Sequence, residues 1–507
     1  MADDSSTPTP RFRMAIIGGG IAALSLAVTL GRYADGSSPI QIDMYEAGPE
    51  ITTVGAGISV WPRTWVIMRE LGLYEELASE AVKANDSSGG EHLKPAFFYR
   101  KSDWPQEGFE YARVMMPNGG TTMHRAEMVG VLLRHLPTNC SIHTSKKLLG
   151  YEEVSEDGRT TYMLHFADGT TAVADVVIGA DGIKSKTRAS MYDLAHKVDC
   201  SDPEATKREE CRQCRHATPK WTGIVTYRYL IPSDRLREIN PTHRALDTPA
   251  LLSYSGKHKF VEQILLQHIV TYPISHGKFV NFVGFVTQEG AEGATYPHKW
   301  VINATREEVV SHYSGWEPEV EQMLRCVENP TVWAIHVLDS LPFSVRGQVA
   351  LMGDAVHAMT PHIGSGGGQA IEDAFILGRF LADPRTTLAR VEVVLRIYQD
   401  IRLQFGLGVV QRSDKVGRMC EFDYPGLYDG APVPASCKED ELDLTKERLG
   451  ELGRAIEDVW SWQVKEHVED QWDEAKSRYE ALFSEKQRDT SAVGKAKNYW
   501  SRVCPIM

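Results

Sequence analysis

The stretch that most constrains the fold is FRMAIIGGGIAALSLAVTLGRY, close to the N-terminus. Residues 14–17 are apolar, as in a buried strand, and residues 21–30 have helical apolar spacing. The glycines between them cost conformational entropy and therefore need a reason. They match G-x-G-x-x-G at Gly18 and Gly20, with Ala23 in the third place, where Ala still permits close helix–strand packing. The order of strand, turn and helix predicts a doubly wound α/β domain.

The next expected strand, IQIDMYEAG, ends in an acidic residue, Glu46. A carboxylate there can accept hydrogen bonds from ribose hydroxyls, while a pyrophosphate would sit on the helix N-terminus, where backbone amides are unpaired. Together these features indicate a dinucleotide site, and a purely structural glycine turn is the alternative. They do not distinguish NAD from FAD.

A second strand-and-turn pattern lies in DVVIGADGIKSKTR, where a buried strand at residues 176–178 runs into Gly-Ala-Asp-Gly. In a doubly wound sheet, the carboxyl ends of the strands line the ligand crevice. Asp181 is therefore expected to face a cofactor, and an ordinary Asp-Gly turn is the alternative.

The third pattern, VALMGDAVHAMTPHIGSGGGQAIEDAFILGRF, again places a Gly-Asp pair after a short apolar strand. Asp354 can hold polyol hydroxyls there, and a helix expected to begin near Gln369 points its N-terminus back at the ligand. Such an N-terminus beside the pyrimidine edge of a flavin stabilises the negative charge of the reduced ring. Pro361 fixes a turn, and the glycines expected to let the backbone approach a flat isoalloxazine ring are Gly364, Gly366, Gly367 and Gly368.

The three patterns, in this order, resemble the single-component FAD-dependent aromatic hydroxylases, which share a Gly-rich dinucleotide fingerprint, a DG motif and a GD motif. The stretch MTPHIGSGGGQAIEDA is most similar to the salicylate-hydroxylase branch, including its fungal members. The resemblance covers roughly residues 12–405. It implies FAD as the bound cofactor, with NADH or NADPH and O2 as co-substrates.

The resemblance also implies individual flavin contacts. MHRAEMVGVLL is similar to the helix whose arginine contacts FAD, which points to Arg125. GAGISVWPRTWVIMRELGL is similar to the segment after the second strand, which points to Gly57. The family usually has Pro-Asn in that segment, whereas this chain has Pro62-Arg63, so the local flavin contact is expected to differ.

The architecture that the family implies is α/β: a Rossmann-like FAD-binding domain interrupted by a mixed β-sheet substrate domain that roofs the active site. The C-terminal region is helical in composition and periodicity, and we expect it to pack on the flavin domain or on a second subunit. Trp460 and Trp462 are expected to be core contacts in this region. The expected boundaries are a disordered leader at 1–11, the FAD-binding domain at 12–83, 117–191 and 334–405, the substrate sheet at 84–116 and 192–333, and the helical region at 406–507.

The activity implied by the resemblance is hydroxylation of a phenolic acid or related phenol. NAD(P)H reduces FAD, O2 gives a flavin C4a-hydroperoxide, and its terminal oxygen attacks an electron-rich ring carbon. A salicylate or 4-hydroxybenzoate type of substrate is expected, and hydroxylation at the carboxylate-bearing carbon would release CO2. Two alternatives remain open: a flavin-dependent epoxidase of an olefinic secondary metabolite, and a catalytically silent flavin-binding partner protein.

Two residues of the expected sheet are the substrate candidates. Arg228, in TYRYLIP, can pair with a carboxylate or phenolate, and a surface arginine is the alternative. Tyr272, before a proline in QHIVTYPI, can hydrogen-bond the substrate oxygen, and a packed aromatic is the alternative. The further candidates for proton transfer are His268, His336 and His362.

One group of cysteines has zinc-like spacing. DCSDPEATKREECRQCRH holds Cys200, Cys211, Cys214 and His216, but no second pair follows and the segment is charged. The favoured interpretation is an exposed loop insertion with free thiols, so no metal is expected, and a zinc site is the alternative.

Composition limits the partners. The formal net charge is −13 and no Lys/Arg-rich run occurs, which gives no support for nucleic acid or an anionic membrane as partner. No apolar run reaches the length of a membrane helix, and MADDSSTPTPR lacks the features of a signal peptide. Eight cysteines in 507 residues are too few for a disulfide scaffold. We therefore expect a cytoplasmic monomer or homodimer that acts on a small aromatic molecule.

Overall fold

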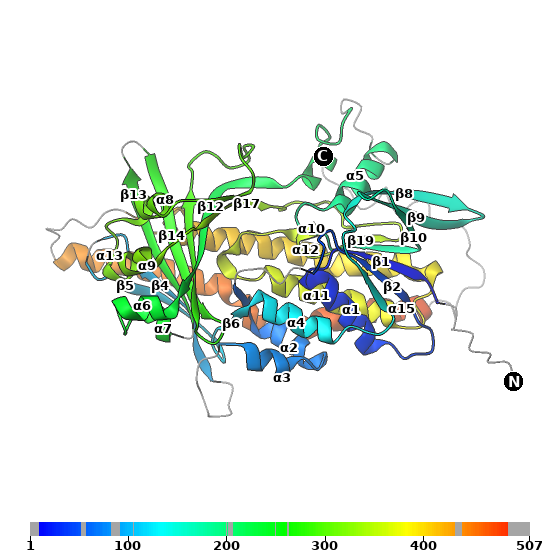
Figure 1. Cartoon of the computed structure of the whole chain (residues 1–507), viewed down its shortest axis with the longest axis horizontal. Helices are drawn as coiled ribbons and strands as arrows, with labels where there is room; N and C mark the ends of the chain where they lie inside the picture. Colours follow the sequence, from blue (N-terminus) through cyan, green and yellow to red (C-terminus); the bar gives the residue numbers. More distant parts are fainter. Residues whose placement is uncertain are drawn as a thin grey trace.

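The computed structural model of the chain places its two largest β-sheets side by side, and one long helix runs along both (Figure 1). The residues that it describes are 10–51, 57–82, 92–104, 106–198, 200, 206–248, 250–260, 263–430 and 439–484. The predicted leader at 1–11 lies almost entirely outside these residues, and so does the end of the helical region.

The first sheet has six strands, and all neighbours in it pair in parallel except the edge strand β18. In spatial order its strands are β18 (Val345–Arg346), β19 (Val349–Leu351), β11 (Val176–Gly179), β1 (Arg13–Ile17), β2 (Gln41–Tyr45) and β7 (Cys140–His143). The almost uniformly apolar β1 and β11 are buried, as expected for a parallel sheet covered on both faces. The carboxyl ends of these parallel strands share one edge, which is the place predicted for the ligand.

Different layers cover the two faces of this sheet. The helices on one side are α1 (Ile21–Tyr33), α4 (Arg125–Arg134) and α11 (Gly366–Ala382), with α2 (Pro62–Glu70) and α3 (Tyr74–Glu80) beyond them. The layer on the other side consists of α5 (Lys186–Val198) and a three-stranded sheet of β8 (Leu148–Glu156), β9 (Arg159–Phe166) and β10 (Thr171–Ala174). The described part of the chain therefore contains the doubly wound α/β domain that the glycine turn predicts.

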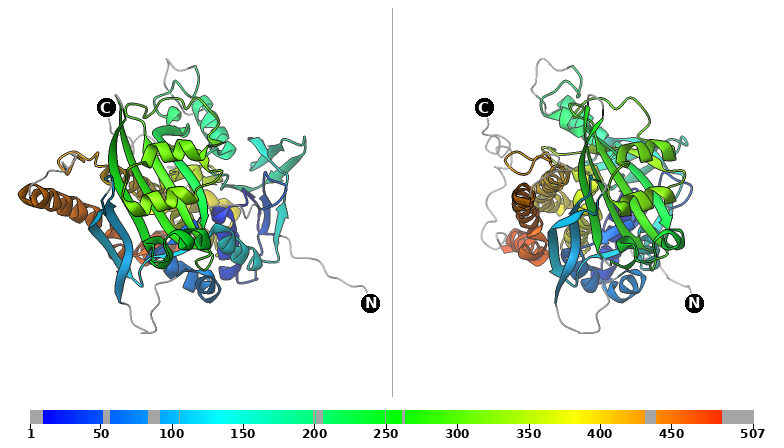
Figure 2. Two further views of the ribbon diagram at one scale, coloured as in Figure 1. Left: turned by 60° about the vertical axis from the view of Figure 1, so that its left-hand side comes forward. Right: turned by 90° about the vertical axis from the view of Figure 1, so that its left-hand side faces the viewer.

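The second sheet has eight strands and is mixed, because β4 and β13 pair in parallel while the other neighbours are antiparallel. In spatial order its strands are β16 (Val301–Asn303), β17 (Thr331–Val337), β12 (Lys220–Pro232), β15 (Phe279–Thr287), β14 (Gln263–Ile274), β13 (Leu251–Phe260), β4 (Leu93–Lys101) and β5 (Phe109–Pro117). The outer face carries α6 (Ser233–Ile239), α7 (Arg244–Asp247), α8 (Arg306–Tyr313) and α9 (Pro318–Cys326), which lie in front of the strands in Figure 2. The inner face packs against the C-terminal helices at its β4–β5 end and faces the first domain over the rest.

Helix α12 (Leu388–Cys420) runs along both domains and is about 50 Å long at 1.5 Å per residue. The boundary predicted at residue 405 falls inside this helix, so α12 is shared by the two domains. The remaining helices are α10 (Asp354–His357), α13 (Glu439–Trp460), α14 (Trp462–Lys465) and α15 (Val468–Ser484), with the 3₁₀ turns η1 (Cys214–Ala217) and η2 (Pro361–Ile363).

The helical region beyond α12 packs on both domains. Helix α13 lies against β5, and α15 lies against α11 and α12. The indole of Trp460 is buried and donates to the Tyr99 hydroxyl at 2.9 Å, and Trp462 is buried as well. The prediction that both tryptophans are core contacts is confirmed.

Helix α11 begins three residues earlier than the sequence predicts, at Gly366 instead of Gln369. A Cβ on Gly367 would lie 2.7 Å from Ile58, and one on Gly368 would lie 2.7 Å from the Thr64 hydroxyl. Close packing of the first turn against β3 (Gly57–Val60) and α2 therefore requires glycine, in spite of its cost inside a helix. β3 pairs with β6 (Thr121–His124) in a separate two-stranded ribbon.

Most of the described charged residues of the cysteine segment are exposed and its cysteines are free thiols, as the sequence predicts, but two of those cysteines are not exposed. Cys211 and Cys214 are buried, with exposed fractions of 1 % and 3 %. The imidazole of His216 is directed elsewhere, since its Nδ1 lies 2.7 Å from the Ser340 hydroxyl. Packing of this segment against α5 covers the two cysteines and leaves most of the charged side chains around them exposed.

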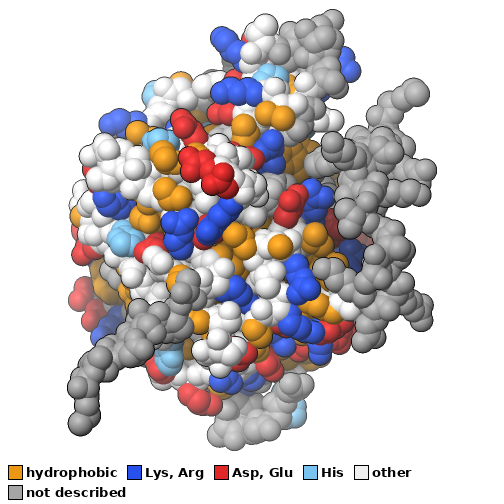
Figure 3. Space-filling view, turned by 90° about the vertical axis from the view of Figure 1, so that its right-hand side faces the viewer, with side chains coloured by type: hydrophobic (Ala, Val, Ile, Leu, Met, Phe, Trp, Pro, Cys, Tyr) orange, Lys and Arg blue, Asp and Glu red, His pale blue; other side chains and the backbone are white. Residues whose placement is uncertain are grey.

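Charged side chains of both signs are interspersed on the face drawn in Figure 3, without a patch of one sign. Among the described residues, no helix combines the length and apolar character needed to cross a bilayer.

Candidate active site

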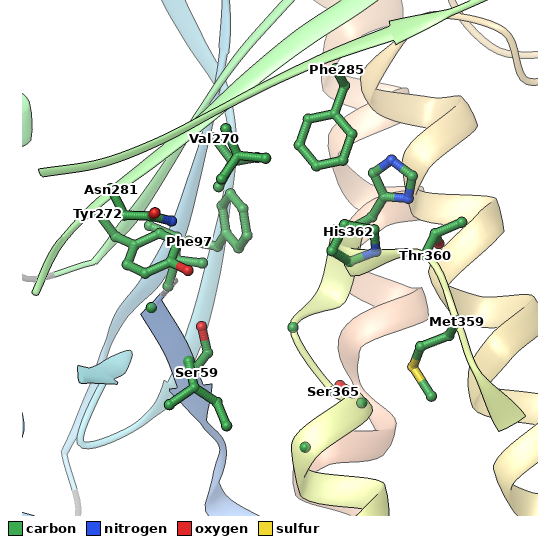
Figure 4. A pocket seen from close by; sticks show the side chains of 18 of the residues that line it. Ser59, Phe97, Val270, Tyr272, Asn281, Phe285, Met359, Thr360, His362 and Ser365 are labelled. Atoms are coloured by element: carbon green, nitrogen blue, oxygen red, sulfur yellow. The ribbon is translucent and has the colours of Figure 1, made fainter. Parts of the chain in front are cut away.

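A cavity of about 250 Å³ lies between the inner face of the eight-stranded sheet and the N-terminus of α11 (Figure 4). One wall consists of sheet residues, among them Phe97, Val270 and Tyr272, and the facing wall holds Met359 and His362. Most of these side chains are apolar and buried. Such a cavity suits a small, flat, largely apolar ligand held by a few polar groups.

The sheet wall follows from strand register. Arg228 of β12 lies opposite Val283 of β15, and Val283 lies opposite Val270 of β14. One row further along, Asn281 lies opposite Tyr272. Side chains two residues apart on a strand share a face, so the alternation of the sequence brings these residues into one wall.

Arg228 is a lining residue, as its prediction requires. Its guanidinium is half-buried, stacks 4.8 Å above the Trp333 ring and makes one long hydrogen bond, of 3.4 Å, to the Thr226 hydroxyl. Burial lowers the pKa of Arg228, and the nearby Tyr272 opposes that shift. The ion pair that would compensate this desolvated charge is not made with any described residue, so an anionic ligand would be stabilised here.

Tyr272 lies beside Gly57, where a Cβ would collide with the phenol ring. Burial raises the pKa of Tyr272 to about 12, although Arg228 acts in the opposite direction. The hydroxyl therefore stays protonated near neutral pH and can donate a hydrogen bond into the cavity.

The facing wall is the GD segment. Asp354 is the first residue of α10, is exposed and has no hydrogen-bond partner among the described residues. A Cβ on Gly366 would meet only Asp354 and Met359, both at 3.9 Å, so open space lies over the start of α11. The predicted flavin-contact residues that line the cavity are Gly57, Asp354, Pro361, Gly364, Gly366 and Gly367.

The N-terminus of α1 forms the other end of the site. Gly18 has a φ of +110°, and a Cβ there would collide with the Ala180 carbonyl, so this turn requires glycine. A Cβ on Gly20 would meet only the Arg125 guanidinium, at 3.8 Å. Arg125 is exposed and has no ion-pair partner within the described part of the chain. A free cation beside the unpaired amides of a helix N-terminus provides the setting for a pyrophosphate.

Glu46 and Asp181, the two acidic residues predicted to contact the cofactor, accept hydrogen bonds from the backbone of the protein itself. Each carboxylate oxygen of Glu46 accepts a backbone amide at 2.7 Å, one from Gly19 and one from Gly48. Asp181 caps α5, accepting from the amides of Lys186 at 2.8 Å and Thr187 at 3.0 Å. A carboxylate oxygen has lone pairs for more than one donor, so contact with a ribose or flavin stays a prediction for both residues.

Arg63, the departure from the family pattern, points away from the cavity. It forms a two-pronged ion pair with Glu372 of α11, at 3.0 and 2.8 Å, and is 3 % exposed. Its guanidinium also lies 4.8 Å from the centre of the Phe405 ring. This arginine anchors α2 to α11 and α12.

The structure separates the three candidate histidines. His336 lies outside the cavity lining and stacks on Trp300 with ring centres 3.6 Å apart. His362 lines the cavity, and neither of its ring nitrogens has a well-formed hydrogen bond to a described residue. Burial, assisted by the nearby His268, holds the pKa of His362 well below its usual value. It is therefore a neutral imidazole that lines the cavity, with its ring nitrogens buried against Gly417 of α12.

His268 lies behind His362, with ring centres 5.1 Å apart, and its Nδ1 is 3.1 Å from the Glu421 carboxyl group. Burial lowers the pKa of His268 to about 3 and raises the pKa of Glu421 to about 8. Both groups are thus uncharged at neutral pH. Sequence reasoning missed Glu421, because it follows α12 in no recognisable motif, and it missed Asn281, which only the register of β14 and β15 brings to Tyr272.

FAD fits the residues present. Arg125 and the open space over Gly20 suit the pyrophosphate, the unpaired Asp354 suits flavin-side hydroxyls, and the glycines at the start of α11 leave room for a flat ring.

The comparisons with known proteins agree with this site. A family model described as an FAD binding domain matches residues 11–196 and 338–413. A salicylate hydroxylase of Pseudomonas putida is 31% identical over 82% of this chain and 87% of its own length. A 6-methylsalicylate 1-monooxygenase of Aspergillus terreus is 32% identical over 82% of this chain and 84% of its own. A solved structure of a salicylate hydroxylase substrate complex has a TM-score of 0.70 at 27% identity, covering 92% of this chain and 98% of that one.

The fold and the site define a flavoprotein oxidoreductase with its substrate pocket beneath a sheet. This chain belongs to the FAD binding domain family, and it is an FAD-dependent aromatic-ring monooxygenase that uses O2 and NAD(P)H. The predicted resemblance to the salicylate-hydroxylase branch, fungal members included, is confirmed.

Proposed function

We propose that the protein hydroxylates a small phenolic acid of the salicylate type. The observation that carries this proposal is the polarity of the cavity. Among the described lining residues, Arg228 is the one permanent cation, it lies on the sheet wall, and the neutral His362 lies on the wall opposite. A carboxylate and a phenol on one ring are the groups that such a pair accepts.

Arg228 binds the carboxylate. Its partly dry setting strengthens a charge-assisted hydrogen bond, and its planar fork matches the two carboxylate oxygens. The stack on Trp333 fixes the plane of the guanidinium. The ring of the substrate then rests against Val270 and Val283, which exclude water from it.

His362 accepts the phenol proton. A neutral imidazole with an unpaired ring nitrogen can take that proton, and a phenolate directs electron density into the ring carbons next to it. Tyr272, which stays protonated, is a donor to the substrate oxygen. When bound, FAD supplies the redox chemistry by which NAD(P)H and O2 deliver one oxygen atom to the ring.

The position of hydroxylation decides the product. Salicylate hydroxylated at its carboxylate-bearing carbon would be converted, with NAD(P)H, O2 and two protons, into catechol, CO2, water and NAD(P)+. The names of two relatives, salicylate hydroxylase and 6-methylsalicylate 1-monooxygenase, support a 2-hydroxybenzoate as substrate. Product analysis must distinguish this reaction from hydroxylation without loss of CO2.

The test uses the FAD-loaded enzyme and a matched panel of salicylate, 6-methylsalicylate, 4-hydroxybenzoate, phenol and benzoate. We expect a 2-hydroxybenzoate to stimulate NAD(P)H oxidation most. Phenol should stimulate it less, because it lacks the carboxylate that Arg228 would bind. With benzoate, the enzyme should release only hydrogen peroxide. Carboxyl-labelled substrate and mass spectrometry report CO2 and added oxygen. Oxygen transfer to an isolated olefin but not to a phenol would instead identify an epoxidase, and no stimulation by any aromatic acid would contradict the proposal.

A further inference from the structure

Three cysteines and one histidine converge about the link between the two domains, away from the active site. His196 lies in the last turn of α5 and Cys200 follows that helix, while Cys211 and Cys214 lie at the turn η1. One ligand atom from each of the four lies within 4.8 Å of all the others. In a tetrahedral zinc site with bonds of about 2.3 Å, sulfurs lie roughly 3.8 Å apart, so the separations are on the scale of a metal site.

The local geometry favours thiolates. The amide of Cys214 points at the sulfur of Cys211 at 3.5 Å, and a donated hydrogen bond favours the charged thiolate form of a sulfur. The sulfurs of Cys200 and Cys211 are 3.1 Å apart, well beyond a disulfide bond of about 2.05 Å. The Nδ1 of His196 is buried and has no hydrogen-bond partner among the described residues. Donors of this kind, brought so close together, are the ligands that a divalent cation binds.

We propose that His196, Cys200, Cys211 and Cys214 bind one zinc ion in a closed, structural site. Three thiolates and one imidazole are a ligand set typical of tetrahedral zinc, and four protein ligands leave no position for water or substrate. The proposal differs from the sequence expectation of no metal, and its histidine is not the His216 of the alternative zinc site, which is held by Ser340.

The place of the cluster in the fold indicates what the metal does. The segment that carries Cys211 and Cys214 leads from α5 of the flavin domain into β12, the strand that bears Arg228. Arg188 of α5 donates to the carbonyl of Ala217 at 2.8 Å and to that of Ala355, in α10, at 3.0 Å. The zinc would therefore fix the link between the cofactor domain and the substrate sheet, and metal binding would contribute to folding and not to the chemical step.

The first experiment compares metal content between two histidine variants. Wild-type protein, produced with zinc and carrying its FAD, is expected to hold one zinc per chain by elemental analysis, with an X-ray absorption shell of sulfur at about 2.3 Å. After dialysis against a chelator, His196→Ala should hold at least about tenfold less zinc than wild type, because a closed site loses one of its four ligands. His216→Ala should hold as much as wild type. Measuring FAD per chain in the same samples shows that each variant is folded.

The second experiment changes the sulfurs. Cys211→Ser combined with Cys214→Ser should lose the zinc and lower the melting temperature, whereas Cys326→Ser, a buried cysteine of α9, should keep the metal. Cobalt in place of zinc should give ligand-field bands at wavelengths beyond the flavin absorption, and those bands should vanish in the double variant. Wild-type protein without bound metal, a Cys200–Cys211 disulfide found by peptide mapping, or loss of zinc in His216→Ala but not in His196→Ala would overturn the proposal.

Discussion

Two buried polar regions flank helix α11, and they are built on opposite principles. Behind the helix, Glu372 and Asp373 have a partner for every carboxylate oxygen, supplied by Arg63, Arg402, His357 and their neighbours. In front of it, His362 lines the cavity, and its ring nitrogens are buried against Gly417 of α12 without a well-formed hydrogen bond to the described residues. A satisfied buried network stabilises one arrangement of the chain, whereas an unsatisfied buried group marks a place where a ligand belongs.

Helix α12 contacts both regions, in each case through a glycine packed against a histidine. A Cβ on Gly406 would lie 2.6 Å from the His357 ring, and one on Gly417 would collide with the His362 ring. The two glycines are close to three helical turns apart and so lie on one face of α12. Each makes room for a histidine, one belonging to the ion-pair network and one to the cavity. The comparison thus separates residues that hold the fold from residues that meet the substrate.

The largest effect is expected from breaking the network behind α11. Arg402→Leu leaves Glu372 and Asp373 buried without their shared cation, which should lower the free energy of unfolding by about 3–5 kcal/mol in urea titrations of the FAD-loaded protein. The control is Glu474→Gln, which removes an exposed pair with Arg478 and should cost less than about 0.5 kcal/mol. Equal losses in the two variants would mean that the buried network is not a scaffold.

The corresponding change in front of α11 should affect catalysis and spare stability. His362→Leu removes the proposed proton acceptor, so product formation should fall roughly 10²–10⁴-fold. The free energy of unfolding should stay level or rise, since no strong hydrogen bond is lost. His336→Leu, outside the cavity lining, is the matched control and should keep its rate. A His362→Leu enzyme with an unchanged rate would remove this histidine from the mechanism.

Arg228 tests whether the cavity is built for an anion. Arg228→Ala should weaken substrate binding roughly ten- to a hundredfold, the equivalent of about 1.5–3 kcal/mol for a charge-assisted hydrogen bond. The variant should keep its FAD, still oxidise NAD(P)H and release hydrogen peroxide in place of product. Arg228→Lys should rescue in part only, because a point charge cannot replace the planar fork. Unchanged affinity and an unchanged ratio of product to NAD(P)H consumed would return Arg228 to a structural role.

The two glycines of α12 sharpen the comparison within a single helix. Gly406→Ala should displace His357 from Asp373 and lower the free energy of unfolding by roughly 1–3 kcal/mol, the usual cost of overpacking. Gly417→Ala should displace His362, so its main effect should be a lower yield of hydroxylated product per NAD(P)H. Urea titration and product analysis of both variants check this division, and identical profiles would refute it.

The smallest effect concerns pH and the pair behind His362. The pKa of Glu421 is raised from 4.5 to about 8, so folded protein keeps a proton that unfolded chain has released, and stability falls as pH rises through that window. Below pH 6.5 the lowered pKa of His268 has the opposite sign, because the unfolded chain then gains a proton, so the two effects cancel in part. Between pH 6.5 and 8, the free energy of unfolding of the wild-type protein should therefore fall by up to about 1.4 kcal/mol per pH unit. Glu421→Gln should remove this slope in unfolding curves, and an equal slope in both proteins would contradict the shift.

Local sequence was sufficient wherever one short segment sets its own geometry. The glycine turn at Gly18, the strand ends at Glu46 and Asp354, and a dinucleotide site follow from backbone conformation and helix termini, which a few adjacent residues decide. The helical character of the C-terminal region follows from periodicity, whereas the mixed sheet was implied by the family resemblance. The start of α11 was misplaced because glycine disfavours a helix locally, and contacts with Ile58 and Thr64 outweigh that preference.

Tertiary structure decided which side chains meet. Arg63 pairs with Glu372 across 309 positions of sequence, and Glu421 reaches His268 across 153, so no local pattern encodes either contact. The same holds for the cysteine cluster, where packing of the link on α5 selects His196 over the neighbouring His216. Local backbone chemistry in the sequence determined a dinucleotide site, and the resemblance carried by the three motifs implied FAD and the class of reaction. The fold alone determined the cavity wall and the candidate metal site, because those depend on distant segments being packed together.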